Sequence, residues 1–272
     1  MENKRLFGKT VLVTGGSKGI GRETARIFGA MGAHVFICGR GIESLKRTSE
    51  SLQEEGLFIS AVQTDVSNPE ACRRLIEKIE AETGRLDIVI NNAGMSSRGT
   101  IEETDPAMFR KIVEINLMGA AYITHYAIPL LGKSKGSIMF ISSLAALHGL
   151  PRTGPYGSSK LALTALSESL RAELHDRDIH VGIVYVGFTR NDPDKICYGG
   201  DGSVITLHRE QYSQSQQKTA GRIVRCALRG RRRTTLTLLG HASRVFYCFF
   251  PRLSDFIAAK IIPKSGRYGD KE

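Results

Sequence analysis

Short runs of apolar residues alternate with longer amphipathic stretches along most of the chain. The apolar runs are rich in valine and isoleucine and too short for buried helices, so each predicts a buried β-strand. They fall at residues 10–14, 34–38, 57–63, 86–90, 136–142 and 180–185, with a seventh candidate at 234–239. Helical spacing of apolar residues predicts helices between them, in a stretch that ends at 31 and at 42–55, 69–83, 106–131 and 155–175.

Strands separated by helices of this length pair in parallel through right-handed crossovers. Because the strands are apolar along their whole length, both faces of the sheet must be covered. The predicted fold is therefore α/β, a Rossmann-like, doubly wound parallel sheet of about seven strands with helices on both faces.

The pattern changes twice towards the C-terminus. Residues 191–218 are polar and rich in Gly, Gln and Ser, and a long irregular segment inside a compact domain is typical of a lid over a binding site. Residues 241–272 combine cations with aromatic and aliphatic side chains. We therefore expect a single catalytic domain at residues 1–240 that carries the lid, followed by a basic, aromatic-rich extension at 241–272.

Composition narrows the class of protein. Of the 272 residues, 41% are hydrophobic and 24% charged, which is ordinary for a soluble globular protein. The five cysteines are scattered and odd in number, so they predict neither a disulfide framework nor a metal site. The N-terminus lacks a signal-peptide pattern, and no apolar stretch reaches the length of a membrane span. This favours a cytoplasmic protein whose contact with a membrane, if any, is peripheral.

The positive charge is concentrated near the C-terminus. The net charge of the chain is +11, and residues 218–272 hold 13 Lys or Arg and 3 Asp or Glu, a net +10. This leaves about +1 for the first 217 residues. The chain contains no DNA- or RNA-binding module, so we expect no nucleic acid partner despite this charge.

A glycine cluster directly follows the first predicted strand. Gly15 allows a tight exit from the strand, Gly19 lets the backbone approach a pyrophosphate, and Gly21 lets the helix pack close to the sheet. The helix N-terminus then presents N–H groups to the anion. Placement after the first strand favours a dinucleotide site over an ordinary turn. The predicted cofactor loop contains Gly15, Ser17, Lys18, Gly19, Ile20 and Gly21.

The end of the second strand predicts which dinucleotide binds. An NAD site usually offers a carboxylate there for the ribose 2′-hydroxyl, but this strand ends in Cys38-Gly39-Arg40. The guanidinium of Arg40, assisted by Lys18, suits a 2′-phosphate. We therefore predict NADP(H). The alternative is that Arg40 is an ordinary solvated residue at a helix entry.

Tyr156 and Lys160 stand four residues apart in a predicted helix, so they lie on one face. A phenol is a poor acid near neutral pH, and a neighbouring cation favours its ionised form. Such a pair can give a proton to a carbonyl oxygen or take one from an alcohol. Many surface helices carry the same spacing, so the pair gains meaning only from the rest of the chain.

Taken in order, these motifs resemble the classical short-chain dehydrogenase/reductase family over roughly residues 8–190. The resemblance includes the glycine loop, Asp65-Val66 after the third strand, and Asn91-Asn92-Ala93-Gly94 after the fourth strand. It also includes Asn116 in a long helix, Ser143 thirteen residues before Tyr156, and Lys160.

The resemblance implies a catalytic tetrad without a metal ion. Tyr156 would act as general acid or base, Lys160 would hold the nicotinamide ribose, and Ser143 would donate a hydrogen bond to the substrate oxygen. Asn116 would hold a water that relays protons towards Lys160. The other residues implied to bind the cofactor are Asp65, Val66, Asn92, Ala93, Gly94, Gly187 and Thr189, together with Tyr156 and Lys160 themselves.

Two positions depart from the family pattern. After the sixth strand the family has Pro-Gly and, four residues beyond the Gly, Thr. Here Val186 replaces the proline and Asn191 takes the place of the threonine. Asparagine can both donate and accept hydrogen bonds, so contact with the nicotinamide carboxamide can survive with altered geometry.

The C-terminal extension resembles those of short-chain reductases that act on long-chain, sphingoid or steroid ketones. Its basic, aromatic-rich residues suit an anionic bilayer surface, or they pack on the body or across a homo-oligomer interface. We expect an NADPH-dependent reductase of a lipophilic ketone, or the reverse alcohol oxidation, in lipid metabolism, as a homodimer or homotetramer. The alternative is a catalytically weak dinucleotide-binding regulator or scaffold.

Overall fold

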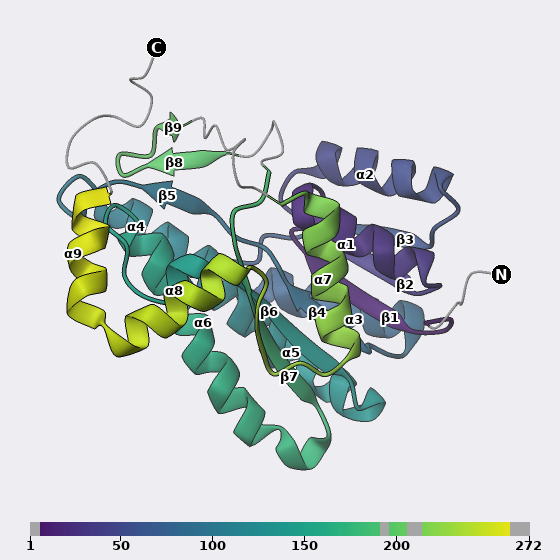
Figure 1. The fold of residues 1–272 in the computed structure, drawn as a ribbon. Helices are drawn as coiled ribbons and strands as arrows, with labels where there is room; N and C mark the ends of the chain where they lie inside the picture. Colours follow the sequence, from purple (N-terminus) through teal and green to yellow (C-terminus); the bar gives the residue numbers. More distant parts are fainter. Residues whose placement is uncertain (1–5, 191–195, 206–213, 262–272) are drawn as a thin grey trace.

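The computed structural model describes residues 6–190, 196–205 and 214–261 (Figure 1). Its centre is a seven-stranded sheet in the order β10-β7-β6-β4-β1-β2-β3, in which every neighbouring pair is parallel. The strands are β1 (Thr10–Thr14), β2 (His34–Gly39), β3 (Ile59–Gln63), β4 (Ile88–Asn91), β6 (Ser137–Ser143), β7 (His180–Val186) and β10 (Arg233–Thr235). The predicted α/β, doubly wound fold is confirmed.

Helices cover both faces of this sheet (Figure 1). One face carries α3 (Pro69–Thr83), α4 (Pro106–Val113), α5 (Gly119–Ser134) and α6 (Gly154–Glu173). The other face carries α1 (Gly19–Ala30), α2 (Ile42–Glu54) and α7 (Gln216–Leu228). Short helical turns lie at η2 (Leu144–Ala146) and η3 (His175–Arg177), and two further helices, α8 (Leu238–Phe249) and α9 (Pro251–Ile261), follow β10.

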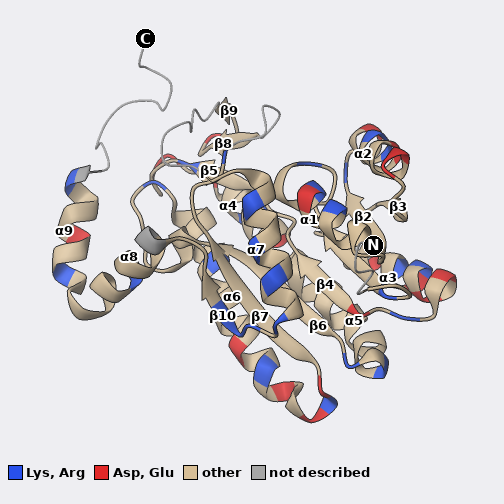
Figure 2. Cartoon of the chain, turned by 45° about the vertical axis from the view of Figure 1, so that its right-hand side comes forward, with Lys and Arg blue, Asp and Glu red and all other residues tan. Residues whose placement is uncertain are grey.

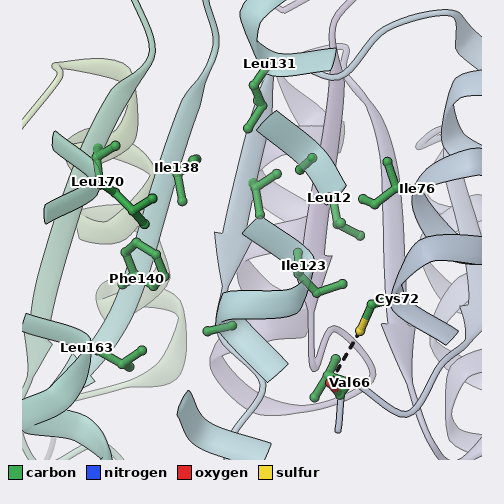
Figure 3. Packing of buried hydrophobic residues seen from close by; sticks show 14 of the residues in the cluster. Leu12, Val66, Cys72, Ile76, Ile123, Leu131, Ile138, Phe140, Leu163 and Leu170 are labelled. Atoms are coloured by element: carbon green, nitrogen blue, oxygen red, sulfur yellow. Dashed lines mark hydrogen bonds between the residues drawn. The ribbon is translucent and has the colours of Figure 1, made fainter. Parts of the chain in front are cut away.

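Alternation along the strands divides the core into two layers. In β1, Leu12 faces the layer under α3 and α5, whereas Val11 and Val13 face the layer under α1 and α2. Figure 3 shows the first layer, where Leu12 lies near Ile123 and Ile76. All these side chains are buried, so apolar burial on both faces holds the sheet.

Helix ends follow local chemistry. Asn68 caps α3 by accepting a hydrogen bond from the N–H of Ala71 at 3.0 Å, and Pro69 takes the first helical position. Gly84 ends the helix with φ of 65°, a left-handed conformation that glycine adopts without a steric penalty.

Two predicted elements differ from the structure. The predicted helix at 106–131 is interrupted by a π-helical turn, η1 (Glu114–Met118), between α4 and α5. The predicted strand at 234–239 was wrong beyond residue 235. Thr237 accepts a hydrogen bond from the N–H of Gly240 at 3.1 Å and so begins α8, which also places the predicted start of the extension inside that helix.

The predicted lid at 191–218 falls partly outside the described residues. Its described part forms β8 (Cys197–Gly199) and β9 (Val204–Ile205), which join β5 (Ser96–Arg98) in a second, three-stranded sheet. Its last residues begin α7. None of these short strands was predicted from the sequence, and the role of the segment as a lid stays a prediction.

Asp87 ties the amino ends of β1 and β4 together, and its removal should weaken the fold. Its carboxylate accepts hydrogen bonds from the N–H of Thr10 at 2.9 Å, from Lys9 Nζ at 3.0 Å and from Arg85 Nε at 2.9 Å. Burial alone would raise the pKa of Asp87, but these three donors hold it below its usual value. We expect Asp87→Asn to lower the free energy of unfolding by about 1–3 kcal/mol at neutral pH.

The pH dependence checks the cause of that loss. A depressed pKa contributes stability that is present above the unfolded value of about 4 and disappears as the pH falls through the folded pKa. In urea unfolding, the difference in the free energy of unfolding between wild type and Asp87→Asn should therefore become smaller at acidic pH. Asp178→Asn, which removes an exposed partner of Lys135, is the control and should change little. An equal gap at all pH values would contradict the assignment.

Candidate active site

The glycine-rich turn joins β1 to α1 at the carboxyl edge of the sheet, where ligands bind in folds of this kind. Gly15 and Gly19 have φ of 64° and 55°, a region that favours glycine. N-cap Lys18 has no acceptor on its side chain, so it cannot satisfy the first N–H groups of α1. The carbonyl of Ile20 accepts a bond from Thr24 within the helix. This turn fits the phosphates of a dinucleotide.

The cofactor loop lies across the end of β2. The N–H of Gly16 donates to Cys38 O at 3.2 Å, and Ser17 Oγ lies 3.7 Å from the position of a Cβ built on Gly39. Exposed Arg40 follows immediately. Arg40 and the loop that carries Lys18 therefore border the same end of β2, as a site for a 2′-phosphate requires.

Asn92 binds the turn after β4 to the turn after β1. Its Nδ2 donates to Thr14 O at 2.9 Å and to Gly15 O at 3.1 Å. In return, Thr14 Oγ1 accepts from the N–H groups of Asn92 and Ala93, each at 3.0 Å. These bonds hold the two turns that would line the cofactor. Thr14 was not among the predicted site residues, although its place at a strand end beside the glycines was a usable signal.

Asn116 and Lys160 meet at Gly94, although 44 positions separate them in the sequence. A Cβ built on Gly94 would lie 3.2 Å from both Asn116 Oδ1 and Lys160 Nζ. The two side chains are 1% and 5% exposed. Lys160 Nζ also donates to Ile141 O at 2.9 Å. The predicted Asn–Lys pair is thus assembled against the backbone of the predicted cofactor motif.

The amide of Asn116 acts as a brace in the π-helical turn η1. Oδ1 accepts from the N–H of Met95 at 2.7 Å, and Nδ2 donates to Met95 O at 2.9 Å and to Ser159 Oγ at 3.0 Å. Single π turns inside α-helices are frequent at functional sites. Met95 and Ser159 were not predicted, because nothing in their local sequence pairs them with residue 116.

Ser143 ends β6 and begins η2. Its Oγ accepts a hydrogen bond from the N–H of Ala145 at 3.2 Å, so the hydroxyl keeps its own hydrogen for another acceptor. Neighbouring Ser142 is buried and donates to Lys160 O at 3.0 Å, which makes it part of the scaffold. The two adjacent serines thus have different hydrogen-bond partners, and the role of Ser143 at the substrate oxygen stays a prediction.

Tyr156 lies in the first turn of α6, one turn before Lys160, and is half-buried. The predicted helix is therefore present, and the pair occupies positions i and i+4. A Cβ built on the next residue, Gly157, would lie 3.2 Å from Ala145 O. Glycine there lets the start of α6 pack closely on the turn that follows Ser143. The segments that carry Tyr156, Lys160 and Ser143 thus come together at the carboxyl end of β6.

The remaining predicted residues lie around this centre in more structural settings. Asp65 accepts hydrogen bonds from the N–H and hydroxyl of Ser67, and Val66 is buried against Gly119. Thr189 Oγ1 donates to Gly187 O at 3.3 Å. Their contact with a cofactor stays a prediction. Asn191, at the position of the expected family threonine, lies outside the described residues.

One further group near the site was not predicted. The side chain of Gln216, at the start of α7, lies 4.0 Å from a Cβ built on Gly19 and donates to Arg190 O at 3.2 Å. Helix α7 therefore borders the cofactor loop. This helix was not predicted, because it begins inside the polar segment at residues 191–218.

Buried thiols do not contribute a nucleophile to this region. Burial raises the pKa of Cys38, at the end of β2, to about 12. Burial, with a further effect of Asp65, likewise raises the pKa of Cys72 to about 12. Both side chains are therefore protonated near neutral pH and act as small apolar residues.

Gly21 should be intolerant of a side chain. A Cβ there would lie 2.1 Å from Gly15 O and 2.6 Å from Asn92 Nδ2, so the backbone of the cofactor loop would have to move. We expect Gly21→Ala to weaken NADPH binding about tenfold or more, from a strain of about 1–3 kcal/mol.

Gly221→Ala is the matched control, because the nearest atom to its Cβ, Ile27 Cδ1, is 4.0 Å away. This helical position should accept alanine without loss of stability or affinity. Fluorescence titration with NADPH and thermal melts of both variants check the prediction. Equal affinities for the two variants would mean that the loop tolerates the displacement.

Comparison with protein families finds a match to short chain dehydrogenase over residues 9–195, more than half of the chain. Among curated proteins, 11-beta-hydroxysteroid dehydrogenase 1A of Arabidopsis thaliana is 35% identical over 206 residues, 75% of this chain and 59% of that protein. Dehydrogenase/reductase SDR family member 7B of Xenopus tropicalis is 32% identical over 244 residues, 86% and 78% of the two chains. The chain thus matches less than two thirds of the length of the first of these relatives.

Solved structures share the fold. A citronellol catabolism dehydrogenase of Pseudomonas aeruginosa superposes with a TM-score of 0.73 at 27% identity, over 85% of this chain and 93% of that one. A metagenomic short-chain oxidoreductase in complex with NADP has a TM-score of 0.69 at 26% identity, over 82% and 91% of the two chains. The fold, the order of the sequence motifs and the sequence similarity therefore all indicate the same protein family.

Proposed function

Because this chain belongs to the short-chain dehydrogenase/reductase family, we propose that it reduces a lipophilic ketone to a secondary alcohol with NADPH, or catalyses the reverse oxidation. The observation that carries the proposal is the junction of Asn116, Lys160 and Gly94 beside Tyr156. Family membership assigns an oxidoreductase with a dinucleotide cofactor. The choice of NADP(H) and of the substrate class is our inference.

The residues around the glycine turn fit a dinucleotide. Gly15 and Gly21 keep the turn free of side chains, and the start of α1 offers N–H groups to phosphate. Arg40 is exposed and suits a 2′-phosphate. When bound, the nicotinamide supplies or accepts the hydride. The relative solved with NADP supports this choice of cofactor.

Tyr156 and Ser143 would act on the substrate oxygen. The phenol of Tyr156 donates its proton to the carbonyl oxygen as negative charge develops there, or takes it back in alcohol oxidation. The Ser143 hydroxyl donates a second hydrogen bond to the same oxygen, because its lone pair, not its hydrogen, is used by the N–H of Ala145. Together they provide the two donors of an oxyanion site.

Lys160 and Asn116 would support that proton transfer. The buried ammonium of Lys160 lies one helical turn from Tyr156 in α6 and would hold the nicotinamide ribose. The amide of Asn116 is used by Met95 and Ser159. A relay water near Lys160 would therefore bind the main chain of the π turn, and the Asn116 side chain would hold that turn in place.

A lipophilic substrate is supported by the surroundings of the site. Phe188, which follows Gly187 at the exit from β7, is about half exposed. Helices α8 and α9 carry further exposed apolar residues at the same end of the molecule. Two relatives are named for a hydroxysteroid and for citronellol, both apolar alcohols. We infer that the ketone lies on a long-chain, sphingoid or steroid-like skeleton.

We further propose that residues 241–272 touch an anionic membrane surface. Among the described residues, no helix is long and apolar enough to cross a bilayer. Amphipathic helices with cations and aromatic residues bind instead at the headgroup level. The expected homodimer or homotetramer also stays a prediction, which sedimentation of the purified chain would test.

Turnover of a ketone panel tests the proposed reaction. The panel should contain a short cyclic ketone, a long-chain ketone and a 3-ketosteroid, with NADPH and NADH compared at equal concentration. We expect NADPH oxidation with at least one lipophilic ketone. Tight NADPH binding without turnover of any ketone or of the matching alcohols would instead favour the regulator.

A further inference from the structure

Helix α8 begins in contact with residues 144–153, the catalytic turn, which follow Ser143 and lead to Tyr156. A Cβ built on Gly240, in its first turn, would lie 2.4 Å from Leu144 Cδ2. Leu144 directly follows Ser143. The N-cap of α8, Thr237, in turn contacts Gly187, where a Cβ would lie 2.7 Å from Thr237 Cγ2. The start of α8 therefore packs on both turns that would enclose the nicotinamide and the substrate oxygen.

A ring stack ties the far end of α8 to the same turn. Tyr247 lies over His148 with ring centroids 4.8 Å apart and planes inclined by 16°. The segment that contains His148 also has backbone hydrogen bonds from Leu147 N to Leu144 O at 3.0 Å, from Thr153 N to Leu150 O at 3.3 Å and from Gly99 N to Arg152 O at 3.0 Å. None of these backbone bonds involves His148, so the Tyr247 ring adds a contact from α8 to the segment that connects Ser143 to Tyr156.

The exposed side chains of the α8–α9 hairpin include apolar residues and cations. Phe249 and Phe256 are 74% and 56% exposed, and Phe250 and Leu253 are also exposed. Lys260 lies over the Phe256 ring at 4.5 Å. The cations of α9 are Arg252 and Lys260, with Asp255 between them in the sequence, and Figure 2 shows blue and red segments along this helix. Exposed aromatic residues beside cations match an anionic headgroup layer.

Resting on the function proposed above, we propose that docking of the α8–α9 hairpin on an anionic bilayer activates the enzyme through the Tyr247–His148 stack. The bilayer binds the hairpin more tightly when the hairpin is packed on Leu144 and His148 than when it is not. Docking therefore stabilises this packing. The segment between Ser143 and Tyr156 is then held in its catalytic position. By linkage, the same contacts strengthen docking when substrate orders that segment.

The test separates docking from coupling. We would measure the rate with cyclohexanone, a water-soluble ketone that vesicles do not concentrate strongly, with and without vesicles of equal parts phosphatidylserine and phosphatidylcholine. Phosphatidylcholine vesicles are the charge control. For wild type we expect kcat/KM to rise about fivefold or more with the anionic vesicles, together with slower hydrogen exchange across residues 144–153.

Three variants assign the effect. Tyr247→Leu removes the ring and should still sediment with anionic vesicles but lose the activation, whereas Tyr247→Phe keeps the ring and should retain it. Phe249→Ser with Phe256→Ser should lose vesicle binding and activation together. Phe7→Ser removes a phenylalanine that is 78% exposed far from the hairpin and should match wild type.

Each outcome decides the proposal. Full activation of Tyr247→Leu, or binding of wild type to vesicles without faster turnover or slower exchange, would overturn the coupling. Failure of wild type to sediment with anionic vesicles would overturn the docking. If no ketone is reduced under any condition, the proposed reaction fails, and the exchange of residues 144–153 in wild type and Tyr247→Leu still decides whether docking reaches the catalytic turn.

Discussion

Replacing Tyr156 with phenylalanine lowers kcat by about 10²–10⁴-fold, the usual contribution of a positioned general acid. The change deletes one oxygen from a half-buried side chain in the first turn of α6 and leaves its ring in place. The ring, Lys160 and the glycine turn are unchanged, so NADPH affinity should fall far less than kcat, and the melting temperature should stay close to wild type. Steady-state rates with the best ketone of the panel, and a fluorescence titration of NADPH, measure the two effects.

Tyr126→Phe is the matched control for this variant. Tyr126 is also a partly buried tyrosine, packed on the core from α5, and its ring meets His125 edge-on at 4.9 Å. It lies in a helix that contributes no proposed proton donor, so its kcat should equal that of wild type. An unchanged kcat in Tyr156→Phe would remove the phenol from the mechanism.

Replacing Arg40 with aspartate reverses the cofactor preference. Loss of a charge-assisted hydrogen bond to the 2′-phosphate costs about 1.5–3 kcal/mol, which corresponds to about 10- to 100-fold weaker NADPH binding. The new carboxylate repels that phosphate and can accept a bond from the 2′-hydroxyl of NADH. Wild type should bind NADPH more tightly and the variant NADH, as titrations of both reduced cofactors will show.

Arg110→Asp makes the same charge change on α4, where Arg110 pairs with Glu114. This variant distinguishes the contact of residue 40 with the 2′-phosphate from the effect of the overall charge of the protein. It should preserve the preference for NADPH. Equal or tighter binding of NADH by wild type would contradict the prediction of NADP(H), and Arg40 would then be an ordinary exposed residue.

Several elements could be predicted because their causes are local. The apolar run of β1 and the helical spacing of apolar residues in α3 depend on neighbours only a few positions away. The glycines of the cofactor loop are also a local requirement, since positive φ at Gly15 and Gly19 disfavours a side chain. The order of these motifs was enough to identify the family and the parallel sheet.

The C-terminal part shows where local patterns are insufficient. Residues 234–239 alternate between threonine and leucine over part of their length, as a strand does, yet Thr237 starts a helix. Thr237 caps this helix, and its first turn packs on Leu144, a residue almost a hundred positions away in the chain. The short strands β5 and β8 likewise form only because distant segments pair.

The sequence by itself determined the family, the α/β fold and the chemical types at the site, namely a phenol, an ammonium group, a hydroxyl and an amide. Only the tertiary structure decided that Asn116 is bound to Met95 and Ser159, that the Ser142 hydroxyl is bound to Lys160 O, and that α8 packs on the turn that follows Ser143. The physical reason is the separation along the chain over which each kind of interaction acts. Dihedral preferences and hydrophobic periodicity act between near neighbours, whereas hydrogen bonds and close packing join residues that only the folded chain brings together.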